Sequence, residues 1–463
     1  MTHVVIIGGG PGGYEAALVG AQLGADVTIV DRDGLGGSAV LTDCVPSKTL
    51  IATAEAMTAL QLSAELGVRF VGHSGAMGGV ASVVLPEVNA RVRELATSQS
   101  RDIARQLEGA GVTVVAGTGR LTGPQTVSVD GPDGQSTLAA DVVLLATGAH
   151  PRVLDSAHPD GQRILTWEQV YDLDELPGRL VVVGSGVTGA EFASAYNALG
   201  CDVVLVSSRD RVLPGEDADA AAVLEAVLVR RGMTVLSRSR AGAVTRDGDK
   251  VRVELTDGRI VEGTHCLLAV GSTPNTSDLG LQEAGVTLTD AGYVSVDGVS
   301  RTTARGVYAA GDCTGVLMLA SVAAMQGRIA MWHALGDAVS PLDLKTVSSN
   351  VFTAPEIATV GWTQKAVDGG EIEAAVVTLA LAGNARAKMQ GIHDGFVKLI
   401  CRPGTGIVIG GVVVGPRASE LIHPISVAVQ ARLTVDELAH AFTVYPSITG
   451  SIAEAARRLH TRD

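Results

Sequence analysis

The sequence predicts an α/β protein built on parallel sheets, and two observations carry that prediction. Within residues 4–31 an apolar run, a glycine-rich turn, a helical stretch and a second apolar run follow one another, and the same order recurs within 180–206. Runs that are apolar throughout are typical of parallel strands buried on both faces. The chain has 463 residues, and at roughly 100–200 residues per domain we expect about three domains.

Composition excludes several classes of protein. An apolar fraction of 46% excludes global disorder. A net charge of −14, without a basic run, disfavours a nucleic-acid partner. The five cysteines are odd in number and scattered, which does not fit a secreted disulfide framework. The chain begins directly with a strand, and we see no signal peptide, membrane span or metal-ligand spacing, so we expect a cytoplasmic protein without stable membrane insertion or a bound metal.

The first glycine-rich turn has the pattern of a dinucleotide site. The predicted strand Val4–Ile7 ends in Gly-Gly-Gly-Pro-Gly-Gly, in which Gly8, Gly10 and Gly13 fit G-x-G-x-x-G. These glycines provide the tight turn, the close approach of backbone to a pyrophosphate, and the close packing of helix on strand. The next predicted strand, 27–31, ends in Asp31, which is placed to accept a hydrogen bond from a ribose hydroxyl.

The second turn differs at its strand end. Leu180–Val183 leads into Gly184, Gly186 and Gly189, then a helix and the strand Asp202–Val206. This strand runs into Ser207-Ser208-Arg209 with no acid, so nothing repels a ribose 2′-phosphate, and we expect NADPH as donor with NADH tolerated. The alternative is that Arg209 is an ordinary surface arginine. Two such sites imply a tightly held flavin and an exchanging nicotinamide.

With these turns, the chain resembles the flavoprotein disulfide reductases over essentially its whole length, and within them the actinobacterial NAD(P)H quinone reductases. The resemblance includes Ala-Thr-Gly at 146–148, the segment 270–275, and Gly306–Asp312, which is similar to the second FAD fingerprint of the family. It implies an FAD-binding domain at 1–148 and 274–345, an inserted NAD(P)H-binding domain at 149–273, and an α+β dimerisation domain at 346–463.

Motifs and resemblance together assign two sets of binding residues. The FAD set is Gly8, Gly10, Pro11, Gly13, Asp31, Arg32, Gly37, Ser38, Lys48, Ala146, Thr147, Gly148, Gly311, Asp312 (facing the ribityl chain), and Leu319 and Ala320, whose amides face the flavin carbonyl. The NAD(P)H set is Gly184, Gly186, Val187, Thr188, Gly189, Glu191, Ser207, Ser208, Arg209, Val270 and Gly271.

The chain departs from the family where the family reduces disulfides. The family has two cysteines in its active segment, but here Ala39 stands at the first position and Cys44 at the second. An alanine methyl cannot form or attack a disulfide. Near the C-terminus Tyr445 replaces the family's acid/base histidine and Gly450 its glutamate. A phenol with a pKa of about 10 is poorly suited to proton transfer near neutrality, so we expect no dihydrolipoamide dehydrogenase activity.

The family residues that serve reduction of the flavin by the nicotinamide are retained. Lys48 matches the family lysine beside flavin N5, and Glu191 matches its ion-pair partner. A cation near N5 favours the reduced, anionic flavin. Cys44 is an inert packing residue, a thiolate that donates charge to the flavin, or a single-cysteine redox centre. The helix N-terminus and Lys48 would lower its pKa, and Asp43 would raise it.

We therefore expect a homodimeric FAD enzyme that passes electrons from NAD(P)H to quinones, in which the partner's Tyr445 segment forms one wall of the acceptor pocket. The alternatives are transhydrogenation between NADPH and NAD⁺, and reduction of a disulfide or peroxide through Cys44. A non-catalytic FAD-bound sensor is the alternative from a different class. It would be reduced slowly by NADPH, against which Lys48 and Glu191 argue.

Overall fold

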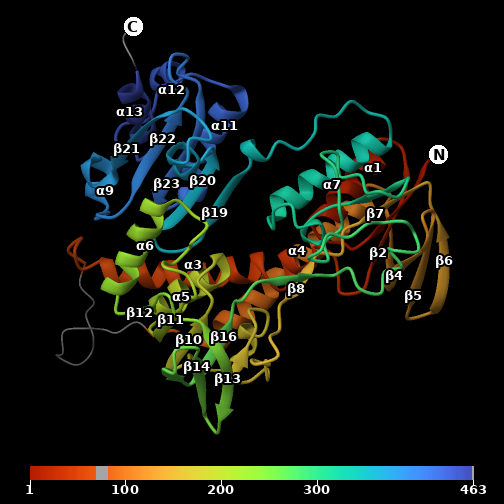
Figure 1. Ribbon diagram of the computed structural model, residues 1–463, viewed down its shortest axis with the longest axis horizontal. Coiled ribbons are helices and arrows are strands. Elements are labelled where there is room, and N and C mark those ends of the chain that lie inside the picture. The colour runs from red at the N-terminus through yellow and green to blue at the C-terminus, as the bar shows by residue number, and fades with distance from the viewer. Residues whose placement is uncertain (69–81, 461–463) are drawn as a thin grey trace. The chain divides into compact units, whose positions relative to one another are not determined.

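The structure, a computed structural model, describes residues 1–68 and 82–460. It divides into two compact units (Figure 1). Unit 1 comprises Met1–Thr49, Asn89–Arg152 and Gly271–Asp343, and unit 2 comprises Leu50–Val88, Val153–Val270 and Leu344–Asp463. Each unit contains one five-stranded parallel sheet, and unit 2 also contains an antiparallel one. The predicted α/β class with two dinucleotide-binding sheets is confirmed.

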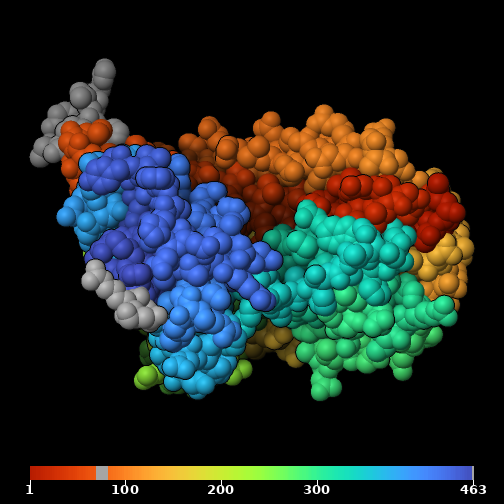
Figure 2. All heavy atoms as spheres, turned by 90° about the horizontal axis from the view of Figure 1, so that it is seen from above, coloured from red at the N-terminus to blue at the C-terminus, as the bar shows by residue number. Residues whose placement is uncertain are grey.

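The core of unit 1 is the parallel sheet β18-β7-β1-β2-β3. Ile7 of β1 pairs with Val30 of β2 and Leu145 of β7, and Val4–Ile6 have no exposed surface, as a doubly covered strand requires. Helices α1 and α7 pack together (Figures 1 and 2), and Arg328 Nε donates to Glu15 Oε2 over 2.9 Å. The elements are β1 His3–Ile7, α1 Pro11–Gln22, β2 Asp26–Asp31, α2 Gly37–Leu41, α4 Leu85–Gly109, β3 Thr113–Ala116, β4 Thr118–Gly123, β5 Thr126–Gly131, β6 Gly134–Ala139, β7 Val142–Leu145, β8 Ala149–Pro151, β17 Ser272–Pro274, β18 Val307–Ala309 and α7 Ala320–Ala334.

Unit 2 repeats this pattern in the parallel sheet β12-β11-β10-β16-β9. Val183 of β10 pairs with Val206 of β11 and Leu268 of β16. A hairpin sheet, β13-β14-β15, adjoins it. These elements are β9 Ile164–Leu165, β10 Arg179–Val183, α5 Val187–Leu199, β11 Asp202–Val206, α6 Ala218–Arg230, β12 Thr234–Leu236, β13 Ala241–Asp247, β14 Lys250–Leu255, β15 Ile260–Gly263 and β16 His265–Leu268.

The C-terminal part of unit 2 is the antiparallel sheet β19-β20-β23-β22-β21 with helices packed on it. Lys398, on β22, is 1% exposed, and its Nζ lies 2.8 Å from Asp217 Oδ2 and 2.7 Å from Asp219 Oδ2, at the start of α6. This buried ion pair ties α6 to the antiparallel sheet. The elements are β19 Ser348–Val351, β20 Glu356–Gly361, α8 Gln364–Asp368, β21 Ala375–Ala380, α9 Ala385–Met389, β22 Phe396–Cys401, β23 Val408–Gly415, α10 Ala418–Leu421, α11 His423–Ala431, α12 Val435–His440 and α13 Gly450–Leu459.

The two compact units divide the chain differently from the predicted domains. The sequence prediction placed all of 1–148 in the FAD domain, but residues 50–88 cluster with unit 2. The reason is that α3 (Cys44–Leu62) leaves unit 1 near Thr49 and continues against α5, where Gln61 Nε2 lies 3.4 Å from the Ala198 carbonyl oxygen. Most residues of the predicted NAD(P)H-binding and dimerisation domains belong to unit 2, and the limits of the three domains stay a prediction.

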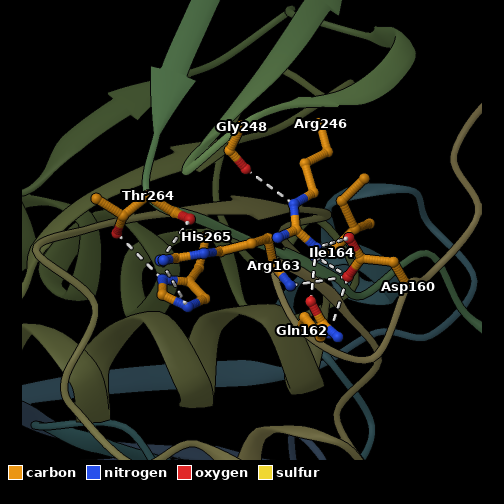
Figure 3. Close-up of polar contacts among 8 residues, drawn as sticks. All are labelled: Asp160, Gln162, Arg163, Ile164, Arg246, Gly248, Thr264 and His265. Atoms are coloured by element: carbon orange, nitrogen blue, oxygen red, sulfur yellow. Dashed lines mark hydrogen bonds and ion pairs between the residues drawn. The ribbon is translucent and has the colours of Figure 1, made fainter.

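A polar network joins the hairpin sheet of unit 2 to its parallel sheet (Figure 3). Asp160 Oδ1 accepts hydrogen bonds from the backbone N–H groups of Gln162, Arg163 and Ile164, and Arg246 Nη1 lies 3.2 Å from its Oδ2. Although burial opposes them, these bonds lower the pKa of Asp160 to about 2.

His265, at the start of β16, belongs to the same network (Figure 3). Its Nε2 lies 3.3 Å from Nη1 of Arg163. Burial, and next the charge of Arg163, lower its pKa to about 4, so it is neutral at physiological pH.

Candidate active site

The first glycine turn leaves room for a ligand ahead of α1. Gly8 has a φ of +105°, and a Cβ there would lie 2.3 Å from the Ala146 carbonyl oxygen. At Gly13 a Cβ would lie 1.9 Å from the Gly8 carbonyl oxygen. Gly10 precedes α1, and the nearest heavy atom a Cβ there would meet is 3.9 Å away. Gly8 and Gly13 are thus required by the protein's own packing, while Gly10 keeps open the space that a pyrophosphate would occupy.

The carboxylate of Asp31, at the end of β2, is hydrogen-bonded mainly to backbone N–H groups of the surrounding turn. Its Oδ2 accepts from Gly9 N–H over 2.6 Å, and its Oδ1 accepts from the N–H groups of Asp33 and Gly34. A carboxylate has about four lone-pair sites, so one remains for a ribose hydroxyl. The exposed Arg32 side chain pairs with Asp33 over 2.9 Å.

A second segment approaches the turn from the side. Gly37 has a φ of +57°, and a Cβ there would lie 2.8 Å from the Gly10 Cα, so its backbone lies directly against the glycine turn. Ser38 follows in α2, and its carbonyl accepts from Asp43 N–H over 2.7 Å. This bond joins the turn to the start of α3.

The start of α3 carries the retained active-segment residues. Cys44 begins the helix and is half-buried, and all five cysteines of the chain are free thiols. Ser47 Oγ donates to the Cys44 carbonyl over 3.4 Å, and Lys48 Nζ donates to Ser47 Oγ over 3.3 Å. Ala39 lies in α2, so this segment offers a single thiol beside a lysine and no dithiol.

Asp312 fits the role of a ribityl acceptor. It follows Gly311, whose φ is +84° and whose N–H donates to Gln326 Oε1 over 2.9 Å. Within the described part of unit 1, no side chain or backbone group donates to its carboxylate. Burial, and next the charge of Asp43, raise its pKa to about 6. A carboxylate in this setting gains from a ligand hydroxyl, so Asp312 and the space at Gly10 together fit a bound FAD.

The N-terminus of α7 lies close in sequence to Asp312 and needs one refinement. Leu319 is the N-cap, but its N–H already donates to the Leu317 carbonyl over 2.9 Å. The first intrahelical bond runs from Ala323 N–H to the Leu319 carbonyl. The amide of Ala320 and its two successors therefore supply the helix's positive end, and the Leu319 amide does not.

The two motifs after β7 and β16 are joined to one another. Thr147 Oγ1 donates to the Asn275 carbonyl over 2.7 Å, and Asn275 Nδ2 donates to the Thr147 carbonyl over 2.9 Å. The N–H of Asn275 donates to the Gly148 carbonyl over 3.0 Å. These bonds join the two segments of unit 1 by which the chain leaves it, after Arg152, and returns to it, at Gly271.

The second glycine turn copies the first. Gly184 has a φ of +111°, and a Cβ there would lie 2.1 Å from the Ala269 carbonyl oxygen. A Cβ at Gly189 would lie 1.9 Å from the Gly184 carbonyl oxygen. At Gly186, the N-cap of α5, a Cβ would have no heavy atom within 4 Å. Val187 and Thr188 begin α5, and Val270 follows Ala269.

Glu191 holds the second turn's helix to the C-terminal part of unit 2. It is 3% exposed, and its Oε1 accepts from Phe352 N–H over 2.8 Å. One turn later Ser194 Oγ accepts from Ala354 N–H over 3.1 Å. Lys48 belongs to unit 1 and Glu191 to unit 2, and their pairing stays a prediction.

The end of β11 separates the three residues predicted to hold a 2′-phosphate. Ser207 has no exposed surface, and its Oγ lies 2.7 Å from Ser185 Oγ and accepts from Arg209 N–H over 3.1 Å. Its hydroxyl therefore joins the glycine turn to the strand end and is not presented to solvent. Ser208 and Arg209 are exposed, and they are the pair able to contact a ligand directly.

Tyr445 lies in an exposed apolar segment of unit 2. Its exposed fraction is 87%, and those of Phe442 and Val444 are 107% and 80%. The next residues are anchored, because Asn384 Nδ2 donates to the Ser447 carbonyl over 3.0 Å and to Ser451 Oγ over 2.8 Å. Exposed apolar side chains on an ordered base are typical of a surface that a partner covers.

Sequence reasoning missed the residues that support the site. Gln326, Asn275 and Ser185 carry no signal by residue type, although each stands within or beside a recognised motif. Within 1–68 and 82–460, no cluster of three or more His, Cys, Asp or Glu side chains is arranged to hold a metal. In the same residues, no helix is both long and apolar enough to cross a bilayer.

Comparison with known proteins places this site in a family. Residues 2–327 match the family described as pyridine nucleotide-disulphide oxidoreductase, and residues 347–456 match the dimerisation domain of that name. The chain is 55% identical to the NAD(P)H dehydrogenase (quinone) of Mycobacterium tuberculosis H37Rv, over 100% of this chain and 95% of the relative. It is 32% identical to the dihydrolipoyl dehydrogenase of Zymomonas mobilis, over 99% and 98% of the two chains.

Comparison with solved structures gives related proteins of the same fold. The crystal structure of LpdA from M. tuberculosis superimposes with a TM-score of 0.94 at 55% identity, covering 100% of both chains. The HOCl-induced flavoprotein disulfide reductase RclA from Escherichia coli superimposes with a TM-score of 0.86 at 24% identity, covering 98% and 99%, which shows the shared fold.

Proposed function

This chain belongs to the pyridine nucleotide-disulphide oxidoreductase family, and on that premise we propose that it is an FAD-dependent NAD(P)H dehydrogenase that reduces quinones. One observation carries the proposal. The active segment holds a single thiol, Cys44, with Ala39 in the place of its partner. A relative 55% identical over the whole chain has a name that refers to quinone.

Bound FAD would supply the chemistry of hydride and electron transfer between the nicotinamide and an acceptor. The chain's own residues bind and orient. The amides and open space at Gly10 and Gly186 receive the two pyrophosphates, and Asp312 accepts from the ribityl chain. Lys48 would hold a positive charge near the flavin and favour its reduced form, and Glu191 fixes α5, whose glycine turn would hold the nicotinamide nucleotide.

The same residues explain why the acceptor is not a disulfide. A disulfide substrate needs a thiolate to attack it, a second thiol to resolve the mixed disulfide, and an acid/base group at the leaving sulfur. Ala39 removes one of the two thiols, and Tyr445 and Gly450 remove the acid/base pair. A quinone takes up electrons without any of these groups.

We also propose that the protein acts as a homodimer in the cytoplasm. The apolar segment Phe442–Tyr445, which lies in the matched dimerisation domain, supports the first point. Five free thiols support a reducing compartment. The partner's Tyr445 segment then forms one wall of the acceptor pocket.

Light scattering of Phe442→Ser, with exposed Val427→Ser on α11 as control, tests the dimer: we expect a shift toward monomer in the first variant alone.

Steady-state assays of the holoenzyme test the reaction. With NADPH as donor we expect turnover with benzoquinone and none with lipoamide, and Cys44→Ser should retain most of the quinone activity. Loss of quinone turnover in Cys44→Ser would support the single-cysteine alternative. Turnover of NADPH with NAD⁺ that exceeds the quinone rate would support transhydrogenation.

A further inference from the structure

A second loop lies against the strand end that carries Arg209. After β12 the chain forms the loop 237–240, and its Arg238 N–H donates to the Arg209 carbonyl over 2.6 Å. The N–H of Ser239 donates to the Ser207 carbonyl over 2.7 Å. Two successive backbone bonds therefore place Arg238 directly beside Arg209, at the same edge of the parallel sheet as the second glycine turn.

The loop is held in this position from behind. Ser239 is 1% exposed, its Oγ donates to the Ser237 carbonyl over 3.1 Å, and it accepts from Arg259 Nη2 over 2.6 Å. Arg238 itself has a φ of +53°, in the left-handed region that favours glycine. An arginine held at a strained position by its neighbours is a feature typical of ligand sites.

The side chains of both arginines are exposed and available to bind an anion. Arg209 and Arg238 are both exposed, and within the described residues neither guanidinium has a hydrogen-bond or ion-pair partner. The exposed Ser208 adds a hydroxyl, and the exposed Asp210 is the carboxylate that follows in the same turn. Two guanidinium groups on adjacent, hydrogen-bonded backbones can bind one phosphate dianion together and outweigh the single carboxylate.

The cluster lies where the adenosine end of a nicotinamide nucleotide is expected. In sheets of this kind the ligand binds at the carboxyl ends of the strands, with the pyrophosphate at the glycine turn and the adenosine ribose at the end of the next strand. Here the Ser185–Ser207 hydroxyl contact of 2.7 Å joins the turn to that strand end. The phosphate that distinguishes NADPH from NADH sits on that ribose.

We propose that Arg238 is a second cation for the 2′-phosphate of NADPH, held beside Arg209 by the loop 237–240, and that this pair determines the preference for NADPH over NADH. The inference rests on the proposed use of a nicotinamide nucleotide and not on the identity of the acceptor. Sequence reasoning had no route to Arg238, because its place depends on how the loop after β12 folds back onto β11.

Equilibrium binding to the holoenzyme tests it, with NADPH, NADH and adenosine 2′,5′-bisphosphate as probes. Arg238→Asn removes the charge with a residue that tolerates a positive φ. We expect it to weaken NADPH and the bisphosphate about tenfold and NADH less than about twofold, as for loss of one charge-assisted hydrogen bond. Arg238→Lys should restore part of the loss, and Arg240→Ala, an exposed neighbour, should change nothing.

Unchanged affinity for all three probes in Arg238→Asn would overturn the proposal. An equal loss for NADPH and NADH would also overturn it, because that pattern indicates damage to the loop. The bisphosphate contains no nicotinamide, so its binding reports the site without any redox step. A wild-type enzyme that binds it in an Arg238-dependent way but fails to reduce quinones would refute the proposed function and leave this inference intact.

Discussion

The two glycine turns of this chain have nearly the same backbone conformation. The strands that follow them end in residues of different chemistry. In both, the first glycine packs against the carbonyl of an alanine, Ala146 or Ala269, and the third against the carbonyl of the first. The strand end after the first turn is an acid, Asp31, whereas the strand end after the second is Ser207 with its hydroxyl turned inward. We infer that the backbone of each turn is suited to a dinucleotide, and that the strand end determines how the ribose of that dinucleotide is recognised.

The turns differ also in how they are anchored. The first has Asp31, which accepts from three backbone N–H groups and so holds its own loop. The second has no such acid, and its helix α5 is held instead by Glu191 and Ser194, which accept from the segment 352–354. We infer that the first site is suited to a cofactor that stays, and the second to one that exchanges.

The largest effect is expected from placing a side chain at a glycine of either turn, one turn at a time. Gly13→Ala and Gly189→Ala place a Cβ 1.9 Å from a backbone oxygen, which the packing cannot accept. We expect Gly13→Ala to lose FAD, measured by absorbance of the purified protein. Gly189→Ala, where it folds, should keep FAD and lose reduction by NADPH. Gly186→Ala, with no heavy atom within 4 Å of the new Cβ, is the control for stability and should weaken only nucleotide binding.

Removing the buried cation of unit 2 should have the next largest effect. Lys398→Ala leaves Asp217, whose side chain is 3% exposed, without its counter-charge. Breaking one partner of a buried pair costs about 3–5 kcal/mol. Urea unfolding should show that loss, and Arg230→Ala, which removes the more exposed pair with Asp394, should cost less than about 1 kcal/mol. Equal losses would mean that the Lys398 pair is not a special anchor of α6.

Removing the strand-end acid should have a smaller effect, confined to the first site. Asp31→Ser takes the acceptor away from the N–H groups of Gly9, Asp33 and Gly34. Each lost partner costs about 1 kcal/mol where water can replace it, and FAD affinity should fall. Ser207→Ala is the matched change at the second site and should leave FAD affinity unchanged. Equal FAD loss in both variants would contradict the division of roles between the turns.

The smallest effect concerns acid stability. His265 has its pKa lowered from 6.5 to about 4 by burial, so the unfolded chain binds more protons between these values, and stability falls as the pH drops from about 6.5 toward 4. His265→Gln should flatten this part of the profile of thermal midpoint against pH. An unchanged slope would exclude His265 as its cause. Asp160, with a pKa of about 2, contributes below pH 4 in the same direction.

Much of the fold was predictable because its signals are local. The strands at 4–7, 180–183 and 202–206 are confirmed, since apolar runs and glycine turns determine them within a few residues. What was not predictable depends on distant packing. The transfer of 50–88 to unit 2, the inward turn of Ser207 and the position of Arg238 all depend on which segments meet.

The candidate site divides in the same way. The absence of the groups that reduce disulfides could be predicted from residue type, since Ala39 and Gly450 lack the necessary atoms wherever they lie. The raised pKa of Asp312 could not be predicted, because it depends on the burial of that side chain and next on the charge of Asp43, which precedes α3. The amide of Leu319 was assigned to the flavin from its place at a helix start, but the structure commits it to the Leu317 carbonyl.

The central claim is that electrons leave from the flavin with no dithiol between it and the acceptor. Anaerobic titration of the holoenzyme with NADPH, followed by mixing with benzoquinone or lipoamide, tests it most directly. The account predicts full bleaching at two electrons per FAD, with fast reoxidation by the quinone and none by lipoamide. Uptake of four electrons with a stable long-wavelength charge-transfer band would contradict it, because a second redox centre would then survive beside Ala39.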